Sequence, residues 1–179
     1  MRINILWYAF MLLLLPACSP TMRVFSDYDK DANISNYKTY SWPTEEEIEK
    51  KGTNPLYYNE LNDKRIKNAV YEQMKSRGFT YQNEKQPLEM HYHIIVEDKT
   101  FIATEPGGYV YPEFWQLKRT QAYPYQQGTL IIDLMDTRTK MLVWRGWATG
   151  AIEDQVSRKP EQTIQKAVAK IFKLFPYQH

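Results

Sequence analysis

Two apolar runs stand almost back to back in the chain: Gly128-Thr129-Leu130-Ile131-Ile132-Asp133-Leu134-Met135-Asp136 and Met141-Leu142-Val143-Trp144-Arg145-Gly146-Trp147-Ala148-Thr149-Gly150. The residues between them are polar and typical of a turn, so the pattern predicts a β-hairpin. Alternation along the second run places Trp144 in the core with Leu142 and turns Arg145 to the other side with Val143 and Trp147. There, Arg145 over an aromatic ring would make a cation–π contact.

The segment before this hairpin also alternates, over residues 88–97. Its apolar side chains share one face of the expected strand, while Glu89, His91, His93 and Glu97 share the other. Two further strands are expected near the N-terminus, at 22–28 and 37–42. The second does not separate into a polar and an apolar face, which favours a strand at the edge of the sheet that ends before Pro43.

Two segments have helical spacing instead. Residues 61–77 carry Ile66, Val70 and Met74 four residues apart, with Asn59 or Asn62 as a cap and Gly78 as the stop. The last helix has Pro160 in its first turn and an apolar face made of Ile164, Ala167, Val168, Ile171 and Phe175. Since each helix must bury its apolar face, we expect an α+β fold, a mainly antiparallel β-sheet with two amphipathic helices packed on one face.

The composition of the chain excludes several classes of protein. The chain has 179 residues, 43% hydrophobic and 25% charged, and a formal net charge of +2. These values exclude a polytopic membrane protein and a wholly disordered chain, and they give no strong field for nucleic acid. A single cysteine excludes a disulfide framework within the chain and a cysteine-rich zinc module.

The N-terminus has the pattern of a signal peptide: Arg2, an apolar run too short to span a bilayer, and small residues before Cys18. A simple secretory signal or an uncleaved anchor are the alternatives. Leu15-Pro16-Ala17-Cys18 resembles a bacterial lipobox, which implies diacylglycerol on the sulfur of Cys18. We therefore expect a signal peptide at 1–17, a short lipid-anchored tether at 18–22 and a single domain at 23–179. Ser19 and the lack of an acidic run after Cys18 favour an outer-membrane protein that faces the periplasm.

Between residues 100 and 128 the alternation is lost, and aromatic side chains gather among glycines and prolines. We expect a long loop here, and long loops are often functional. Its rings either fold back over one face of the sheet or rest near the lipid surface, or they recognise a sugar or a partner chain. The candidate ligand-binding residues are Phe101, Tyr109, Tyr111, Phe114, Trp115, Tyr123 and Tyr125.

Catalytic patterns are weak. His91 and His93 could bind a metal with Glu89 or Glu97, yet no third ligand is fixed by spacing, and pairing with cross-strand neighbours explains them as well. No serine lies in a nucleophile elbow. Asp133 and Asp136, or Glu153 and Asp154, could serve as an acid–base pair only across a cleft.

Several of these segments together resemble one family of bacterial envelope lipoproteins, the domain-of-unknown-function family 4136 (DUF4136). The matching stretches are Asp27-Tyr28-Asp29, Tyr37-Lys38-Thr39-Tyr40-Ser41-Trp42, Arg77-Gly78-Phe79, Met90-His91-Tyr92-His93, Gly128 to Leu134, Leu142-Val143-Trp144-Arg145-Gly146 and Ala167 to Pro176. The resemblance implies a lipid-anchored, single-domain protein that faces the periplasm, and it brings no catalytic residues.

The sequence thus favours a non-enzymatic lipoprotein without a cofactor, either a binding module or a passive structural protein. Its expected partners are the membrane, through the N-terminal lipid, and an envelope protein or glycan, and no nucleic acid. The alternative is a metal-dependent hydrolase centred on His91 and His93.

Overall fold

The computed structural model describes residues 22–43, 56–106, 118–152 and 159–176. Within these ranges the helices are η2 (Ile34–Asn36, a 3-10 turn), α2 (Glu60–Lys75) and α4 (Pro160–Phe172). The strands are β1 (Arg23–Tyr28), β2 (Thr39–Ser41), β3 (Thr80–Tyr81), β4 (Leu88–Pro106), β5 (Lys118–Asp136) and β6 (Leu142–Ile152). Strands and helices are mixed along the chain, so the protein has the α+β fold that the sequence predicts.

The described strands form one six-stranded sheet in the order β1-β6-β5-β4-β2-β3. β1, β6, β5 and β4 pair antiparallel, whereas β2 is parallel to both β4 and β3. The sheet is therefore mixed, and the expectation of a mainly antiparallel sheet is wrong. The reason is that α2 lies between β2 and β3 in the chain and supplies the crossover that parallel neighbours need. β2 also lies inside the sheet, not at its edge.

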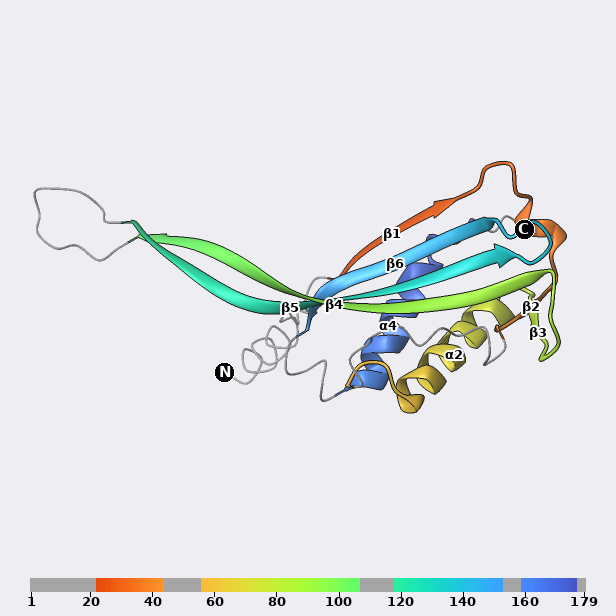
Figure 1. Ribbon diagram of the computed structural model, residues 1–179, viewed down its shortest axis with the longest axis horizontal. Helices are drawn as coiled ribbons and strands as arrows, with labels where there is room; N and C mark the ends of the chain where they lie inside the picture. The colour runs from red at the N-terminus through yellow and green to blue at the C-terminus, as the bar shows by residue number, and fades with distance from the viewer. Residues whose placement is uncertain (1–21, 44–55, 107–117, 153–158, 177–179) are drawn as a thin grey trace, which may run out of the picture.

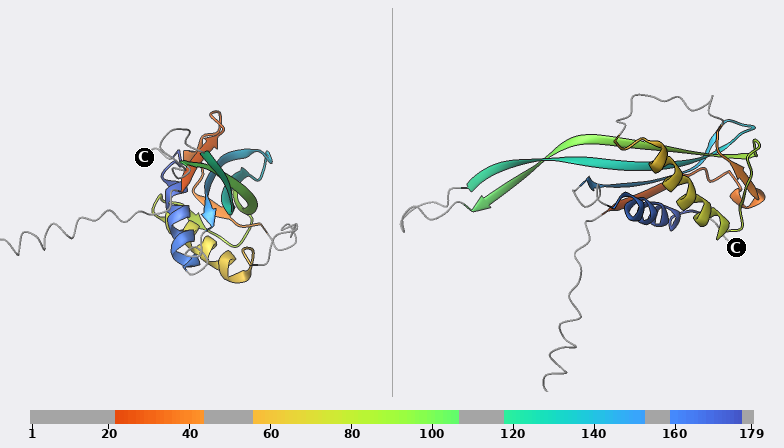
Figure 2. Two further views of the ribbon diagram at one scale, coloured as in Figure 1. Left: turned by 90° about the vertical axis from the view of Figure 1, so that its left-hand side faces the viewer. Right: turned by 90° about the horizontal axis from the view of Figure 1, so that it is seen from below.

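α2 and α4 pack side by side against one face of the sheet (Figures 1 and 2). α2 is one residue longer at its start and two residues shorter at its end than the predicted helix 61–77, but its cap and its stop are residues that the sequence predicts. The side chain of Asn59 accepts a hydrogen bond from Asn62 N at 3.0 Å, and Gly78 adopts φ 81° after the helix. Phe79 N then donates to Met74 O at 3.1 Å, which closes a helix-ending turn and buries the Phe79 ring. Among the described helices, none is long and apolar enough to cross a membrane.

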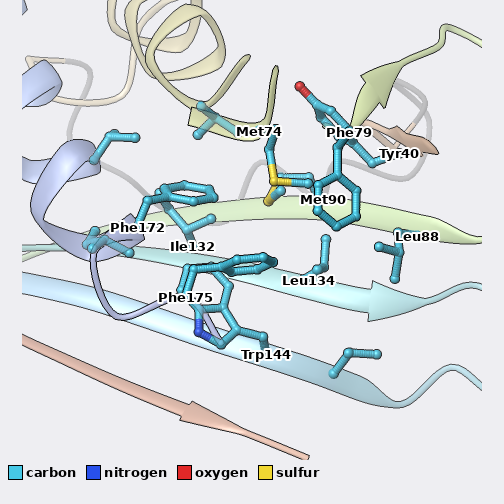
Figure 3. Packing of buried hydrophobic residues seen from close by; sticks show 14 of the residues in the cluster. Tyr40, Met74, Phe79, Leu88, Met90, Ile132, Leu134, Trp144, Phe172 and Phe175 are labelled. Atoms are coloured by element: carbon cyan, nitrogen blue, oxygen red, sulfur yellow. The ribbon is translucent and has the colours of Figure 1, made fainter. Parts of the chain in front are cut away.

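The core between the sheet and the helices includes Trp144 of β6, which is fully buried beside Phe175 (Figure 3). Its ring centroid lies 5.4 Å from that of Phe172 and 4.9 Å from that of Phe175. The prediction that Leu142 is buried beside Trp144 is wrong, since Leu142 is 39% exposed. A register shift explains this: Leu134 pairs with Trp144 but Met135 pairs with Leu142, so Val143 is an extra residue in β6. The bulge lets Val143 and Trp144 both be buried.

β4 and β5 continue well beyond the rest of the sheet (Figure 1). The last pair that β6 makes with β5 is Gln126 with Ile152, whereas β4 and β5 stay paired out to Pro106 and Lys118. We call residues 99–106 and 118–125 the arm. The predicted loop is therefore wrong over these residues, because they form a two-stranded ribbon. At 3.3 to 3.4 Å a residue, the arm extends about 25 Å.

Candidate functional site

The arm carries the candidate residues that the structure describes. Phe101 is 61% exposed, Ile102 64%, Tyr123 43% and Tyr125 38%. Phe101 lies directly across from Tyr123, and Lys99 directly across from Tyr125, so these side chains share one face of the ribbon. Ile102 lies on the other face. Large apolar groups are thus exposed on both faces of a ribbon that pairs with no third strand among the described residues.

Four of the predicted aromatic residues, Tyr109, Tyr111, Phe114 and Trp115, lie outside the described residues, and so does Cys18. Of the seven candidate ligand-binding residues, the structure therefore places Phe101, Tyr123 and Tyr125, and their role in binding stays a prediction. These three come from two different strands, and the pairing of β4 with β5 brings them together.

The base of the arm is held to the body by a short chain of hydrogen bonds. Tyr57, just before α2, donates from its hydroxyl to Gln126 Oε1 at 3.0 Å. Gln126 Nε2 in turn donates to Asp98 Oδ1 at 3.1 Å, across the β4–β5 pair. At the next step, Lys99 Nζ lies 2.9 Å from Glu97 Oε2, and this carboxylate raises the pKa of the Lys99 ammonium. Of these contacts, the Tyr57–Gln126 hydrogen bond joins the base of the arm to the segment before α2, and the other two lie within the β4–β5 ribbon.

His91 and His93 lie on the sheet face that the helices leave uncovered, and they contact different carboxylates. His91 Nε2 is 2.9 Å from Glu89 Oε1, and His93 Nε2 is 3.7 Å from Asp133 Oδ2. Glu97, the other predicted ligand, pairs with Lys99. Within the described part of the chain, no three His, Cys, Asp or Glu side chains come together as metal ligands. The arrangement therefore favours the structural interpretation of these histidines.

The two aspartates of the predicted hairpin are also engaged separately. Asp133 accepts two hydrogen bonds from Arg145, whose pKa it raises, so Arg145 makes an ion pair where a cation–π contact was expected. Asp136 accepts from the hydroxyl of Tyr37 at 2.6 Å and from Thr139 N at 2.8 Å. The Tyr37 hydroxyl, followed by these turn N–H groups, lowers the pKa of Asp136 to about 2. Neither geometry is that of an acid–base pair across a cleft. Glu153 and Asp154 lie outside the described residues.

One feature was not predicted from the sequence. It is a cavity of about 430 Å³ that lies between the helices and the sheet, near the base of the arm. Its walls come from α2, α4, β4, β5 and β6, and they include Ile66, Ile94, Val96, Leu130 and Ile164. Each of these residues belongs to an ordinary apolar stripe. Only the tertiary arrangement shows that the stripes do not meet at this end of the core.

The model of the domain of unknown function DUF4136 matches residues 24–177. The chain belongs to this family. The match spans the sheet, the arm and both helices. The family has no assigned reaction, so membership in DUF4136 gives this protein a fold and no chemistry. No curated protein matches the chain.

Solved structures of other proteins align with the fold of this chain. A DUF4136 family protein from Bacteroides thetaiotaomicron aligns with a TM-score of 0.55 at 17% identity, over 89% of this chain and 98% of that one. A PDZ domain protein from Parabacteroides distasonis aligns with a TM-score of 0.54 at 14% identity. That alignment covers 98% of this chain but only 41% of the Parabacteroides chain. At these identities the likeness shows the fold alone.

Proposed function

We propose that this DUF4136 protein is a lipid-anchored lipoprotein of the bacterial outer membrane that faces the periplasm and acts as a non-catalytic binding module. In this proposal the arm contacts another component of the envelope, a protein or a glycan. The observation that carries it is the exposure of Phe101, Ile102, Tyr123 and Tyr125 on a ribbon to which the described part of the chain adds no third strand. An isolated two-stranded ribbon is marginally stable in water, and exposed apolar clusters mark interaction sites.

The first described strand, β1, begins at the same end of the body as the base of the arm. Arg23, the first residue of β1, pairs with Thr149 of β6, and Thr149 pairs with Thr129 of β5, three residues from Gln126. Only three residues lie between Cys18 and Met22, so the two are at most about 15 Å apart. A lipid on Cys18 would therefore hold the base of the arm close to the bilayer, while the arm extends about 25 Å from that base.

The chemistry of the arm suits a partner with flat apolar surfaces. Tyrosine and phenylalanine offer a large area of contact, and the phenol hydroxyl adds a hydrogen bond, so both protein chains and sugar rings are suitable. The salt bridge of Lys99 with Glu97 gives the base of this surface a polar border. None of these groups is arranged for bond making, which favours binding over catalysis.

The anchor is tested by mass spectrometry of the protein from membranes, together with a Cys18→Ala variant. We expect the native chain to begin at Cys18 with acyl groups on its sulfur and to sediment with the outer membrane. The variant should lose this modification and leave the outer-membrane fraction. A bare Cys18 sulfur in the native protein would refute the anchor.

The arm is tested by photo-crosslinking in intact cells. A benzoyl-phenylalanine residue is placed at Phe101 or Tyr123, and at Met141 as a control, because Met141 is 62% exposed but lies in the turn at the other end of β5. We expect the same covalent adduct, identified as one protein or one glycan, from both arm positions and not from Met141. Adducts from all three positions alike, or from none, would exclude the arm as the binding element.

A further inference from the structure

The 430 Å³ cavity lies between the helices and the sheet, near the base of the arm. The described residues that line it lie outside the arm. α2 contributes Ile66 and α4 contributes Ile164, while Ile94, Val96 and Leu130 come from β4 and β5. Its volume is within the range of about 300–1,000 Å³ that small-molecule sites occupy. It is at the lower end of that range, which suits one slender ligand.

The uncharged polar side chains in the walls already have partners within the protein. Asn62 Nδ2 donates to Tyr57 O at 2.9 Å, Thr163 Oγ1 donates to Lys159 O at 3.1 Å, and Thr129 shares a 3.0 Å hydrogen bond with Thr149. The walls therefore offer few free hydrogen-bonding groups, and water is poorly held in such a space. An apolar ligand would lose little on entering and would remove apolar surface from water.

Two cations complete the lining. Arg65 of α2 is half-buried and uses Nη1 to bond Asn62 Oδ1 at 2.8 Å, which leaves the other donors of its guanidinium fork. Lys166 of α4 is exposed, so it lies at the opening. In the described part of the chain, neither cation has a carboxylate within salt-bridge distance. Positive charge beside apolar walls matches a ligand with an apolar tail and an anionic head.

We propose that this cavity binds a long-chain fatty acid. The acyl chain lies against Val96, Leu130 and Ile164, and the carboxylate pairs with Arg65 and Lys166. A single chain fits the size of the cavity, and the two cations favour an ionised head over an uncharged lipid. This site is separate from the arm and does not depend on lipidation of Cys18.

The test uses the full chain with Cys18→Ala, which cannot be acylated, titrated with the fluorescent fatty acid cis-parinaric acid. We expect saturable binding of one molecule per chain, with displacement by palmitate and at least tenfold weaker displacement by hexadecanol, which lacks the charge. Absence of saturable binding would overturn the proposal. Equal displacement by palmitate and hexadecanol would overturn the role of the cations.

A matched pair of variants locates the ligand. Val96 lines the cavity, whereas its neighbour Ile95 points to the other face of the sheet and is 43% exposed. Val96→Trp should fill the cavity and weaken binding at least tenfold, and Ile95→Trp should leave it unchanged. Equal losses in both variants, with both folded by circular dichroism, would place the ligand elsewhere. Arg65→Gln with Lys166→Gln should weaken palmitate binding and leave hexadecanol unaffected.

A final comparison distinguishes an external fatty acid from the chain's own proposed lipid. The native protein is examined by native mass spectrometry with added palmitate. A palmitate adduct on the native protein, as on the Cys18→Ala chain, supports the proposal. An adduct only on the Cys18→Ala chain would mean that the anchor's own acyl chain fills the cavity, which would overturn the assignment of an external fatty acid and leave the anchor intact.

Discussion

Arg145 holds the carboxylate of Asp133 with two hydrogen bonds, from Nε to Oδ1 and from Nη2 to Oδ2, each 2.6 Å long. The two residues face each other across the β5–β6 pair on the sheet face without helices. Asp133 is only 4% exposed, while the Arg145 side chain is 43% exposed. Arg145 therefore compensates the negative charge that Asp133 buries in the sheet, while the Arg145 side chain itself stays in contact with water.

Removal of Arg145 should be costly because it leaves this carboxylate buried without its cation. We expect Arg145→Gln to lower the free energy of unfolding by about 2 kcal/mol, less than for a fully buried pair since water can reach the site. Urea denaturation measures the change. The control is Lys99→Gln, which breaks the exposed pair with Glu97 and should leave the free energy of unfolding almost unchanged. Equal effects of the two variants would contradict the importance of the Arg145–Asp133 pair.

Two tyrosines should respond in opposite ways to loss of the hydroxyl. Tyr37 donates to the Asp136 carboxylate, whereas Tyr40 is 1% exposed and its hydroxyl has no partner among the described residues. We expect Tyr37→Phe to lower the unfolding free energy by about 1–2 kcal/mol, and Tyr40→Phe to leave it unchanged or raise it by up to about 1 kcal/mol. Parallel urea melts of the two variants test this, and a loss of more than 1 kcal/mol in Tyr40→Phe would reveal a hidden partner.

The pH dependence of stability should include Asp136. Its pKa in the folded state is lowered from 3.8 to about 2, chiefly by the Tyr37 hydroxyl. A folded-state pKa below the unfolded value stabilises the protein above the unfolded pKa, and this stability is lost as the pH falls from about 4 through 2. The difference between wild type and Tyr37→Phe should therefore shrink over that window. A difference that stays constant from pH 7 to pH 2 would contradict the assignment to Asp136.

Close packing of α4 on β6 predicts that Gly146 tolerates no side chain. A Cβ there would lie 2.5 Å from Ile171 Cγ2 and 2.6 Å from the Trp144 ring. We expect Gly146→Ala to lower the unfolding free energy by about 1–3 kcal/mol through overpacking. Gly150, on the same strand, is the control, since among the described residues its Cβ would meet only Met22 Cα, at 3.8 Å. Gly150→Ala should stay within about 0.5 kcal/mol of wild type, and a similar loss at both glycines would refute this explanation.

The parts of the fold that depend on residues close together in the chain could be predicted from the sequence. The Asn59 cap and the Gly78 stop of α2 need only a few residues of context, and both are confirmed. The α4 face and the β5–β6 hairpin follow from periodicity that a buried face imposes. The bulge at Val143 could not be predicted, because nothing in a single strand shows how its partner's register shifts.

The arm and the cavity were missed for different physical reasons. A ribbon with no buried face imposes no alternation on its residues, so residues 118–125 have no strand pattern. Pro124 also indicated a loop, yet beyond β6 one edge of β5 is unpaired and tolerates a residue without an N–H. The parallel pairing of β2 depends on how α2 crosses the sheet, and so does the cavity. The sequences of the short strands β2 and β3 do not show this crossing.

The exposed aromatic residues of the arm should matter for binding and not for folding. Phe101 and Tyr123 lie beyond the last pair of β5 with β6, and 61% and 43% of their surfaces are exposed. Their contacts therefore add little to the core, and we expect Phe101→Ala with Tyr123→Ala to change the unfolding free energy of the body by less than about 0.5 kcal/mol. For capture, benzoyl-phenylalanine is placed at Tyr125, both in the otherwise native chain and in the double variant. The double variant should lose the partner that the otherwise native chain captures. Urea denaturation and crosslinking together separate the two roles: a stability loss above about 1 kcal/mol would make the rings part of the packing, and undiminished capture would show that the partner does not use them.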